Sequence, residues 1–372
     1  MKSALNIVIV RILVLAFIMA IFGGIWDTNI WHATVGREGF FQPPHNVLYL
    51  GVLIALFTSI IAWLRTRERQ WRNIALVIVL IPVSALLDDM WHRVFGIEQA
   101  GTVVVYWSPP HLATELMLLG AIILLLQHIQ CTVVRAQEKT VLSLFLLTLI
   151  FQIFEAMLWP LKPTGIFRVI GMWGGIVEPA AFILIVIIAQ RLTRQRHAGT
   201  LFAFFQITLV TLIYIVSTLY FDWREIPHDL WLRYTGPYFH HSVLFRSGIY
   251  ILAAYIAERQ QRPSVQGMIM GGVIGTLLYS VGYFLIPSLF YVRTLRLELT
   301  ASQFGYTFPE GIAMAVLTFL AGLCIGKCAE LWVQKKYSEK WSWMLQYIPV
   351  MFVITCVVGL TYGVFFMEIQ RS

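Results

Sequence analysis

Charged side chains are the scarcest class in this sequence. Asp, Glu, Lys and Arg account for 12% of the 372 residues, about half of the roughly 25% found in ordinary globular domains. Hydrophobic residues account for 59%. So few charges exclude a water-soluble globular protein of this length, because its surface could not be covered with polar groups. The composition predicts an all-α, polytopic integral membrane protein.

Cysteine and the familiar catalytic signatures are also sparse. Four cysteines are too few for a disulfide framework. The sequence contains neither the HExxH motif of zinc peptidases nor the GxSxG elbow of serine hydrolases, so these hydrolase classes are not indicated. It shows no haem or flavin motif either. A redox function would therefore need an electron-donor partner.

Long hydrophobic runs are abundant. A helix that crosses the roughly 30 Å hydrocarbon core needs about 20 apolar residues, and about eleven runs meet this criterion. We predict a single transmembrane domain over residues 1–372, with the first two helical hairpins in 1–131, the middle hairpins in 140–260 and the C-terminal helices in 267–372. The predicted spans lie near residues 5–26, 46–64, 73–92, 111–131, 140–159, 169–190, 199–221, 242–257, 267–286, 309–332 and 344–366.

Basic residues cluster after the even-numbered runs. Cytoplasmic loops carry an excess of Lys and Arg, so we predict that these loops and the N-terminus are cytoplasmic and the C-terminus extracytoplasmic. The expected location is the cell (plasma or inner) membrane. This topology accounts for the net charge of +8 without nucleic acid as a partner. The clusters contain Arg65, Arg67, Arg69 and Arg72; Arg135 and Lys139; Arg191, Arg194 and Arg196; Arg259 and Arg262; and Lys327, Lys335, Lys336 and Lys340.

Asp and His recur in the first two hairpins, on the predicted extracytoplasmic side. In each hairpin an Asp ends the first helix, a His follows it, and a Pro-Pro-His sequence begins the second helix. Imidazole and carboxylate together form the mixed nitrogen and oxygen donor set that transition metals accept. We predict a metal site, for which this donor set leaves copper, zinc and iron, including di-iron, open. Its predicted ligands are Asp27, His32, His45, Asp88, His92 and His111.

Further polar residues accompany these predicted ligands. Asp88 and His92, like His111 and Glu115, are four residues apart, so each pair shares one helix face. Tyr49, Asp89 and Glu115 are predicted catalytic or supporting groups that orient the imidazoles. The fourth hairpin offers His228, Asp229, His240 and His241, which could form a second metal site, a proton path or a structural network.

Structural interpretations compete with these functional ones. Any single histidine at a membrane surface is most simply structural, and only the joint pattern favours a metal. The tryptophans Trp26, Trp31, Trp91 and Trp107 are interpreted as part of the aromatic belt at the membrane interface. His128 and His197 lie among the basic helix ends and are interpreted as solvated.

The first hairpin resembles a known family of membrane enzymes. It carries Trp31-His32-x-Thr34-x-x-Arg37-x-x-x-Phe41-x-Pro43-Pro44-His45, then Tyr49 and Arg65-Thr66-Arg67. Over residues 26–67 this looks like the copper-binding hairpin of the C subunit of particulate methane and ammonia monooxygenases. The resemblance implies copper ligation by Asp27, His32 and His45. In that family the Asp stands four residues before the first His, where this sequence has Thr28.

Three functions remain open from the sequence. The first is a membrane-embedded, copper-dependent oxidoreductase of monooxygenase type, acting on a small apolar or lipid-soluble substrate in contact with membrane lipid. The second is a metal-ion or proton-coupled transporter, in which Glu155, Glu178 and Glu310 would mark a path through the membrane. The third, which the short loops disfavour, is a lipid-linked glycosyltransferase.

Overall fold

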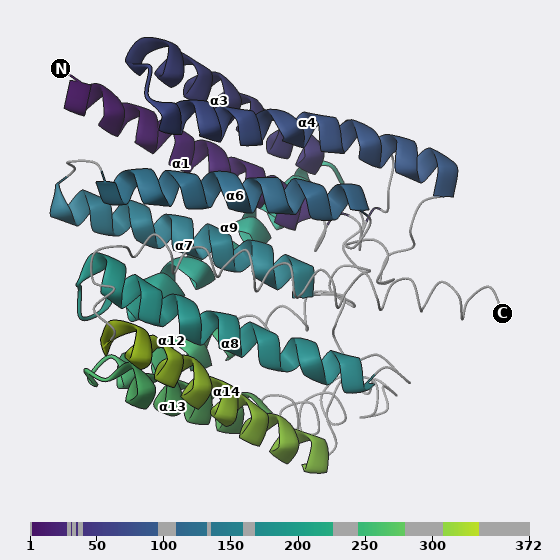
Figure 1. Cartoon of the computed structure of the whole chain (residues 1–372). Helices are drawn as coiled ribbons and strands as arrows, with labels where there is room; N and C mark the ends of the chain where they lie inside the picture. Colours follow the sequence, from purple (N-terminus) through teal and green to yellow (C-terminus); the bar gives the residue numbers. More distant parts are fainter. Residues whose placement is uncertain are drawn as a thin grey trace. The chain divides into compact units, whose positions relative to one another are not determined.

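The computed structural model describes residues 2–27, 31, 35, 40–95, 109–131, 135–158, 168–225, 245–279 and 308–334. The regular structure in these ranges is helical, as the composition predicts (Figure 1). The helices are α1 (Lys2–Trp26), α3 (Pro43–Thr66), α4 (Arg69–Phe95), α6 (Pro109–Cys131), α7 (Ala136–Leu158), α8 (Arg168–Thr193), α9 (Ala198–Trp223), α12 (Phe245–Ala257), α13 (Pro263–Ile274) and α14 (Phe308–Gln334).

Eight of these helices, all except α12 and α13, are long and apolar enough to cross a membrane. A helix bonds its backbone amides and carbonyls internally, which the hydrocarbon core of a bilayer requires. The chain is a multi-pass helical membrane protein. Each of the first ten predicted runs overlaps one described helix, although α12 and α13 have only 13 and 12 residues. The last predicted run, 344–366, lies outside the described residues.

The described helices form two compact units. The first unit contains α1, α3, α4, α6, α7 and the part of α9 from Thr211 onward. The second contains α8, α12, α13, α14 and the part of α9 up to Val210. In the first unit α1 packs on α3 and α4 packs on α6 (Figure 1). In the second unit α13 packs on α14.

One face of α3 is made of large apolar residues and the opposite face of small ones. Leu50, Leu53, Phe57, Ile61 and Leu64 are exposed and recur every three or four residues, as one helix face does. Hydrocarbon solvates such side chains, whereas small residues let neighbouring helices approach closely. The buried face contains Gly51, Val52, Ala55, Ser59 and Ala62.

Two glycines bring α1 and α3 into backbone contact. A Cβ atom at Gly23 would lie 2.5 Å from the backbone nitrogen of Leu48 and 2.7 Å from the carbonyl oxygen of Pro44. A Cβ atom at Gly51 would lie 2.6 Å from the carbonyl oxygen of Ala16. No Cβ atom fits at such distances, so glycine is what permits this close packing. The contact at Gly23 holds the first turn of α3 against the last turn of α1.

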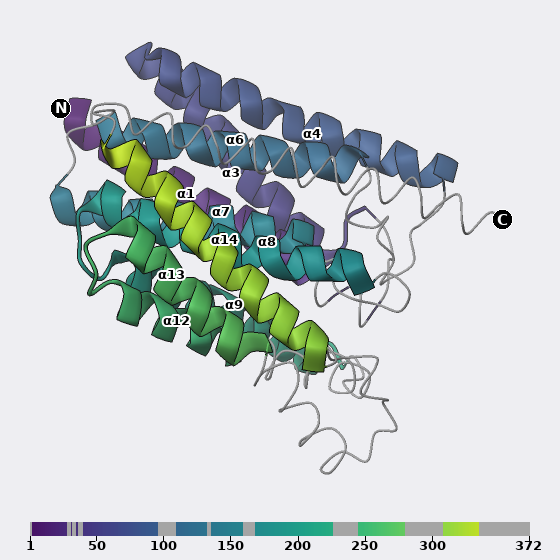
Figure 2. The same ribbon diagram turned by 60° about the horizontal axis from the view of Figure 1, so that its bottom comes forward.

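In the second unit, α13 and α14 also meet through glycines (Figure 2). A Cβ atom at Gly271 would lie 2.7 Å from the carbonyl oxygen of Thr318, and one at Gly326 would lie 2.3 Å from that of Pro263. Elsewhere in this unit the buried Glu258, just after α12, accepts hydrogen bonds from the backbone amides of Gly199 and Thr200. This carboxylate therefore caps the N-terminus of α9.

We expect Gly23→Ala to destabilise the first unit, because its new methyl group must displace backbone atoms of α3. The expected loss is about 1–3 kcal/mol of unfolding free energy, measured by denaturant unfolding in detergent with circular dichroism. Gly24→Ala is the matched control, since its Cβ would meet only the Leu48 side chain at 3.6 Å. Equal stability of the two variants would contradict this packing.

Candidate functional site

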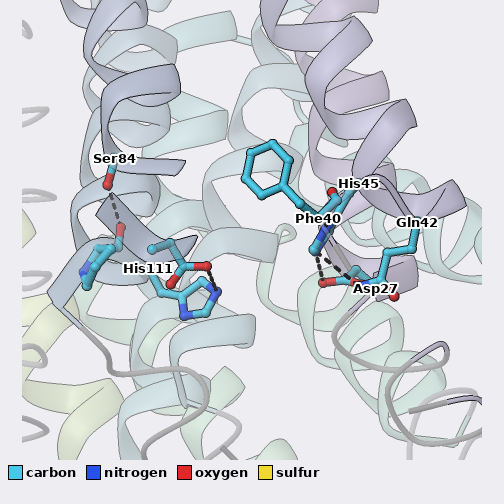
Figure 3. Close-up of polar contacts among 8 residues, drawn as sticks. Asp27, Phe40, Gln42, His45, Ser84 and His111 are labelled. Atoms are coloured by element: carbon cyan, nitrogen blue, oxygen red, sulfur yellow. Dashed lines mark hydrogen bonds and ion pairs between the residues drawn. The ribbon is translucent and has the colours of Figure 1, made fainter. Parts of the chain in front are cut away.

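The first predicted Asp and His of the metal set form a close pair. Asp27 follows the last residue of α1, and His45 lies in the first turn of α3. The Nε2 atom of His45 is 2.8 Å from Oδ2 of Asp27, and both side chains are largely buried, with exposed fractions of 13% and 9%. Figure 3 shows the two side chains pointing toward each other, with Gln42 beside them.

The start of α3 positions His45 in this pair. Pro43 and Pro44 occupy the first helical positions, where proline loses no intrahelical hydrogen bond and already has a helical φ. Gln42, at the N-cap, turns its side chain toward the pair, and its Nε2 donates to Oδ1 of Asp27 at 3.1 Å. The Nδ1 atom of His45 is 3.0 Å from the carbonyl oxygen of Phe40.

These contacts determine where hydrogen can sit on the His45 ring. A carbonyl oxygen only accepts, so Nδ1 carries a hydrogen and donates it to Phe40. The remaining ring nitrogen, Nε2, faces a carboxyl oxygen at 2.8 Å. Two lone pairs would repel at this distance, so a proton or a metal cation must lie between Nε2 and Oδ2. A backbone carbonyl on one ring nitrogen is also the usual way in which proteins orient a metal-binding histidine.

The second hairpin repeats the arrangement. Asp88 lies near the end of α4 and His111 in the first turn of α6, and their Oδ2 and Nε2 atoms are 3.5 Å apart. The exposed fractions of these side chains are 14% for Asp88 and 35% for His111, so this pair is the more open. The Oγ of Ser84 donates a 2.6 Å hydrogen bond to the carbonyl oxygen of Pro110 and so holds the start of α6 against α4 (Figure 3).

The two hairpins correspond in the positions that hold these pairs together. The residue four positions before the Asp contacts the carbonyl oxygen of the second proline. It is Gly23 in the first hairpin and Ser84 in the second. The histidine then follows that proline directly. Sequence analysis missed these two positions, although their equal spacing from Asp27 and Asp88 is a signal that could have revealed them.

The described members of the predicted ligand set form two pairs. In the part of the chain that the structure describes, no three His, Cys, Asp or Glu residues are grouped so that they could hold a metal ion. Figure 3 shows His45 and His111 in separate contacts. His32 lies outside the described residues, and although α4 includes His92, the side chain of His92 is outside them too. The metal site therefore stays a prediction. Of its predicted ligands, the structure describes one Asp–His pair in each of the first two hairpins.

The predicted supporting residues lie close to these pairs in chain position. Tyr49, one turn after His45, stacks on Phe40 at a ring distance of 5.0 Å and lies 5.7 Å from the His45 ring. Glu115 is half-buried, one turn after His111 on α6. Asp89 is half-buried on α4. The positions of Tyr49, Glu115 and Asp89 do not test the supporting roles predicted for them, which stay predictions.

The other predicted polar residues fall into two groups. Of the acids, Glu178 is buried and accepts a 2.8 Å hydrogen bond from the hydroxyl of Tyr250, and Glu155 accepts one of 3.0 Å from Gln152. The others lie outside the described side chains: His228, Asp229, His240, His241 and Glu310.

Two structural interpretations from the sequence are wrong in the environment they give. Trp26 and Trp31 do not face outward but are buried within the protein, where they pack on Tyr220 at ring distances of 5.2 and 5.8 Å. His128 is buried against Trp71 at 4.2 Å and is not solvated. In both cases the interpretation relied on where such residues usually lie, whereas their burial depends on tertiary contacts that the local sequence does not show. His197 is largely exposed, as predicted.

Comparison with known proteins does not narrow the class of protein beyond what the fold shows. No family model, no curated protein and no solved structure matches the chain. The chain is a multi-pass helical membrane protein with Asp–His pairs at the matching ends of its first two hairpins.

We expect Ser84→Ala to loosen the second pair. It removes a buried hydrogen bond between helices and should lower the unfolding free energy by about 1 kcal/mol. It should also speed modification of His111 by diethyl pyrocarbonate, followed by mass spectrometry. Ser59→Ala is the control, because the Ser59 hydroxyl bonds to carbonyls of its own helix, at Ala55 and Leu56. An unchanged rate at His111 in Ser84→Ala would show that Ser84 does not position this ring.

Proposed function

We propose that this membrane protein is a metal-dependent oxidoreductase, with copper as the metal, built around the Asp–His pairs of its first two hairpins. The observation that carries the proposal is the contact between His45 Nε2 and Asp27 Oδ2, which requires a proton or a cation between the two atoms. The Asp88–His111 pair, at the equivalent position of the next hairpin, supports it. Chance pairing would not be expected to recur at the same register.

The spacing of the second pair suits a shared ion, and that of the first is the spacing of a hydrogen bond whose proton a metal would replace. Two ligand atoms bonded to one metal at roughly 2.0–2.1 Å and at the tetrahedral angle are about 3.3 Å apart. The two Nε2–Oδ2 distances, 2.8 Å and 3.5 Å, lie on either side of this value. Imidazole and carboxylate donors suit copper, zinc and iron. The resemblance of the first hairpin to a copper-binding hairpin favours copper, and His32 and His92 would add a further ligand to each half.

The residues around the first pair would prepare it for a metal. The Phe40 carbonyl fixes the His45 tautomer so that Nε2 is the ligating atom. The Gln42 amide holds the Asp27 carboxylate by its other oxygen. Burial keeps bulk water from competing for the ion. A bound copper ion would supply one-electron redox chemistry, and the electrons would come from a partner protein.

The position of the pairs supports our proposal for the substrate class. They stand at one end of the membrane-spanning helices, which the distribution of basic residues predicts to be extracytoplasmic. A small apolar or lipid-soluble substrate would reach this end from the membrane. The proposal therefore retains the monooxygenase type of reaction that the resemblance of the first hairpin implies.

Metal content of the purified protein tests the proposal. We expect wild-type protein, loaded with copper and desalted, to retain one ion per Asp–His pair. His45→Ala and His111→Ala should each lose about half of the bound copper, because each removes one nitrogen ligand. His197→Ala is the control, since His197 is an exposed histidine that belongs to neither pair. Copper content that is unchanged in both pair variants, or absent from wild type, would contradict the proposal.

Cation transport is the second candidate. It is favoured by Glu178, a buried acid in a membrane-spanning helix that accepts a hydrogen bond from the hydroxyl of Tyr250. Such acids commonly mark ion or proton paths. Uptake of labelled copper into proteoliposomes separates the two functions. We expect no uptake above empty vesicles; uptake that Glu178→Gln abolishes would establish transport instead.

A further inference from the structure

Three buried polar atoms lack a hydrogen-bond partner among the described residues and belong to side chains linked to the Asp27–His45 pair by chain position, ring packing or a hydrogen bond. They are Nε1 of Trp26, Nε1 of Trp31 and Oε1 of Gln42, here called the three unsatisfied atoms. The residues that carry them are only 4%, 3% and 4% exposed. Trp26 precedes Asp27 in the chain, and Gln42 is bonded to Asp27.

The tryptophan rings cannot easily turn their N–H groups to solvent. Trp26 and Trp31 meet edge to face at 6.1 Å. Trp26 also packs on Tyr220 at 5.2 Å, and Trp31 on Phe221 at 6.0 Å. All of these residues belong to the first unit. Edge-to-face contacts of this kind fix ring orientation, so the two donors stay inside the protein.

The Gln42 amide is fixed as well. Its nitrogen must face Asp27, because the amide oxygen would repel the carboxylate. The Oε1 acceptor is therefore held away from that contact. Neither flipping the amide nor rotating an indole ring would satisfy the three atoms.

Unsatisfied atoms of this kind need a physical explanation. Each costs about 1–3 kcal/mol when buried, and nearly all buried polar groups in proteins are paired. Single atoms of this kind also occur elsewhere in the described structure, as at Asn6 Oδ1, Trp71 Nε1 and Thr318 Oγ1. Three of them on side chains linked to one candidate metal pair favour a bound molecule that supplies the partners.

We propose that Trp26, Trp31 and Gln42 bind the hydroxyl group of a membrane-soluble alcohol beside the Asp27–His45 pair. A hydroxyl oxygen accepts two hydrogen bonds and donates one, which matches two indole donors and one amide acceptor. A carbonyl group would leave the Gln42 oxygen unpaired, and an ammonium group would leave both indoles unpaired. The alkyl part would lie against the aromatic cluster of Trp26, Trp31, Tyr220 and Phe221. As a substrate or product class, this inference rests on the proposed function; as a binding site, it stands on the three unsatisfied atoms.

Nuclear magnetic resonance of the full-length protein with ¹⁵N-labelled indoles tests the proposal directly. The chain has 13 tryptophans, and the signals of interest are assigned by their loss in Trp26→Phe, Trp31→Phe and Trp71→Phe. The probes are hexan-1-ol and n-hexane. We expect hexan-1-ol to shift the Trp26 and Trp31 signals and n-hexane to leave them in place, with the Trp71 signal unchanged as the internal control.

The variants measure the hydrogen bonds. Phenylalanine keeps an aromatic ring and removes the donor, so Trp26→Phe and Trp31→Phe should each weaken hexan-1-ol binding roughly fivefold. Trp71→Phe should leave it unchanged. Equal shifts with n-hexane would show an apolar cavity only, and signals that exchange with water and ignore the alcohol would show a buried water. Either result overturns the proposal.

The same titration separates this inference from the proposed function. It is run on protein stripped of metal by a chelator and again on copper-loaded protein. Alcohol binding in the stripped protein, together with a failure to bind copper, would uphold the alcohol site and refute the metal. Copper binding at the pairs without any alcohol-specific shift would uphold the metal site and refute the alcohol site.

Discussion

The contact between an aspartate at the end of one helix and a histidine at the start of the next is the interaction on which this account depends. A carboxylate and an imidazole nitrogen at 2.8 Å must share a cation. In a membrane-spanning segment such groups are costly unless they pair. Their pairing therefore explains why Asp27 and His45 can be buried. In the function that we propose, a metal ion takes the place of the shared proton.

The packing of the helices brings the Asp and His of each pair together. Gly23 lets the backbones of α1 and α3 touch, and one of the atoms it meets is the carbonyl oxygen of Pro44, just before His45. In the second hairpin Ser84 reaches the carbonyl just before His111 with a hydroxyl instead. The first hairpin thus uses van der Waals contact and the second a hydrogen bond to hold the same proline carbonyl. The more buried of the two pairs is the one in the closer-packed hairpin.

Much of the fold could be predicted from the sequence, because a bilayer requires long apolar helices and these are visible as uninterrupted runs. The Asp and His residues could also be singled out, since few polar groups occur there. The residues that they contact could not be predicted. The spacing suggested ligands drawn from both hairpins, whereas the described side chains pair within each hairpin, and the burial of Trp26 and His128 depends on residues distant in sequence such as Tyr220 and Trp71. Such contacts are set by tertiary packing, which composition and periodicity do not encode.

X-ray absorption at the copper edge of the metal-loaded protein tests the central claim most directly. If the ion lies between imidazole nitrogen and carboxylate oxygen, the spectrum should show nitrogen or oxygen neighbours at roughly 2.0 Å with the multiple scattering of imidazole. That scattering should disappear when His45 and His111 are both replaced by alanine. A shell of sulfur at about 2.3 Å, or imidazole scattering that persists without these two histidines, would contradict the account.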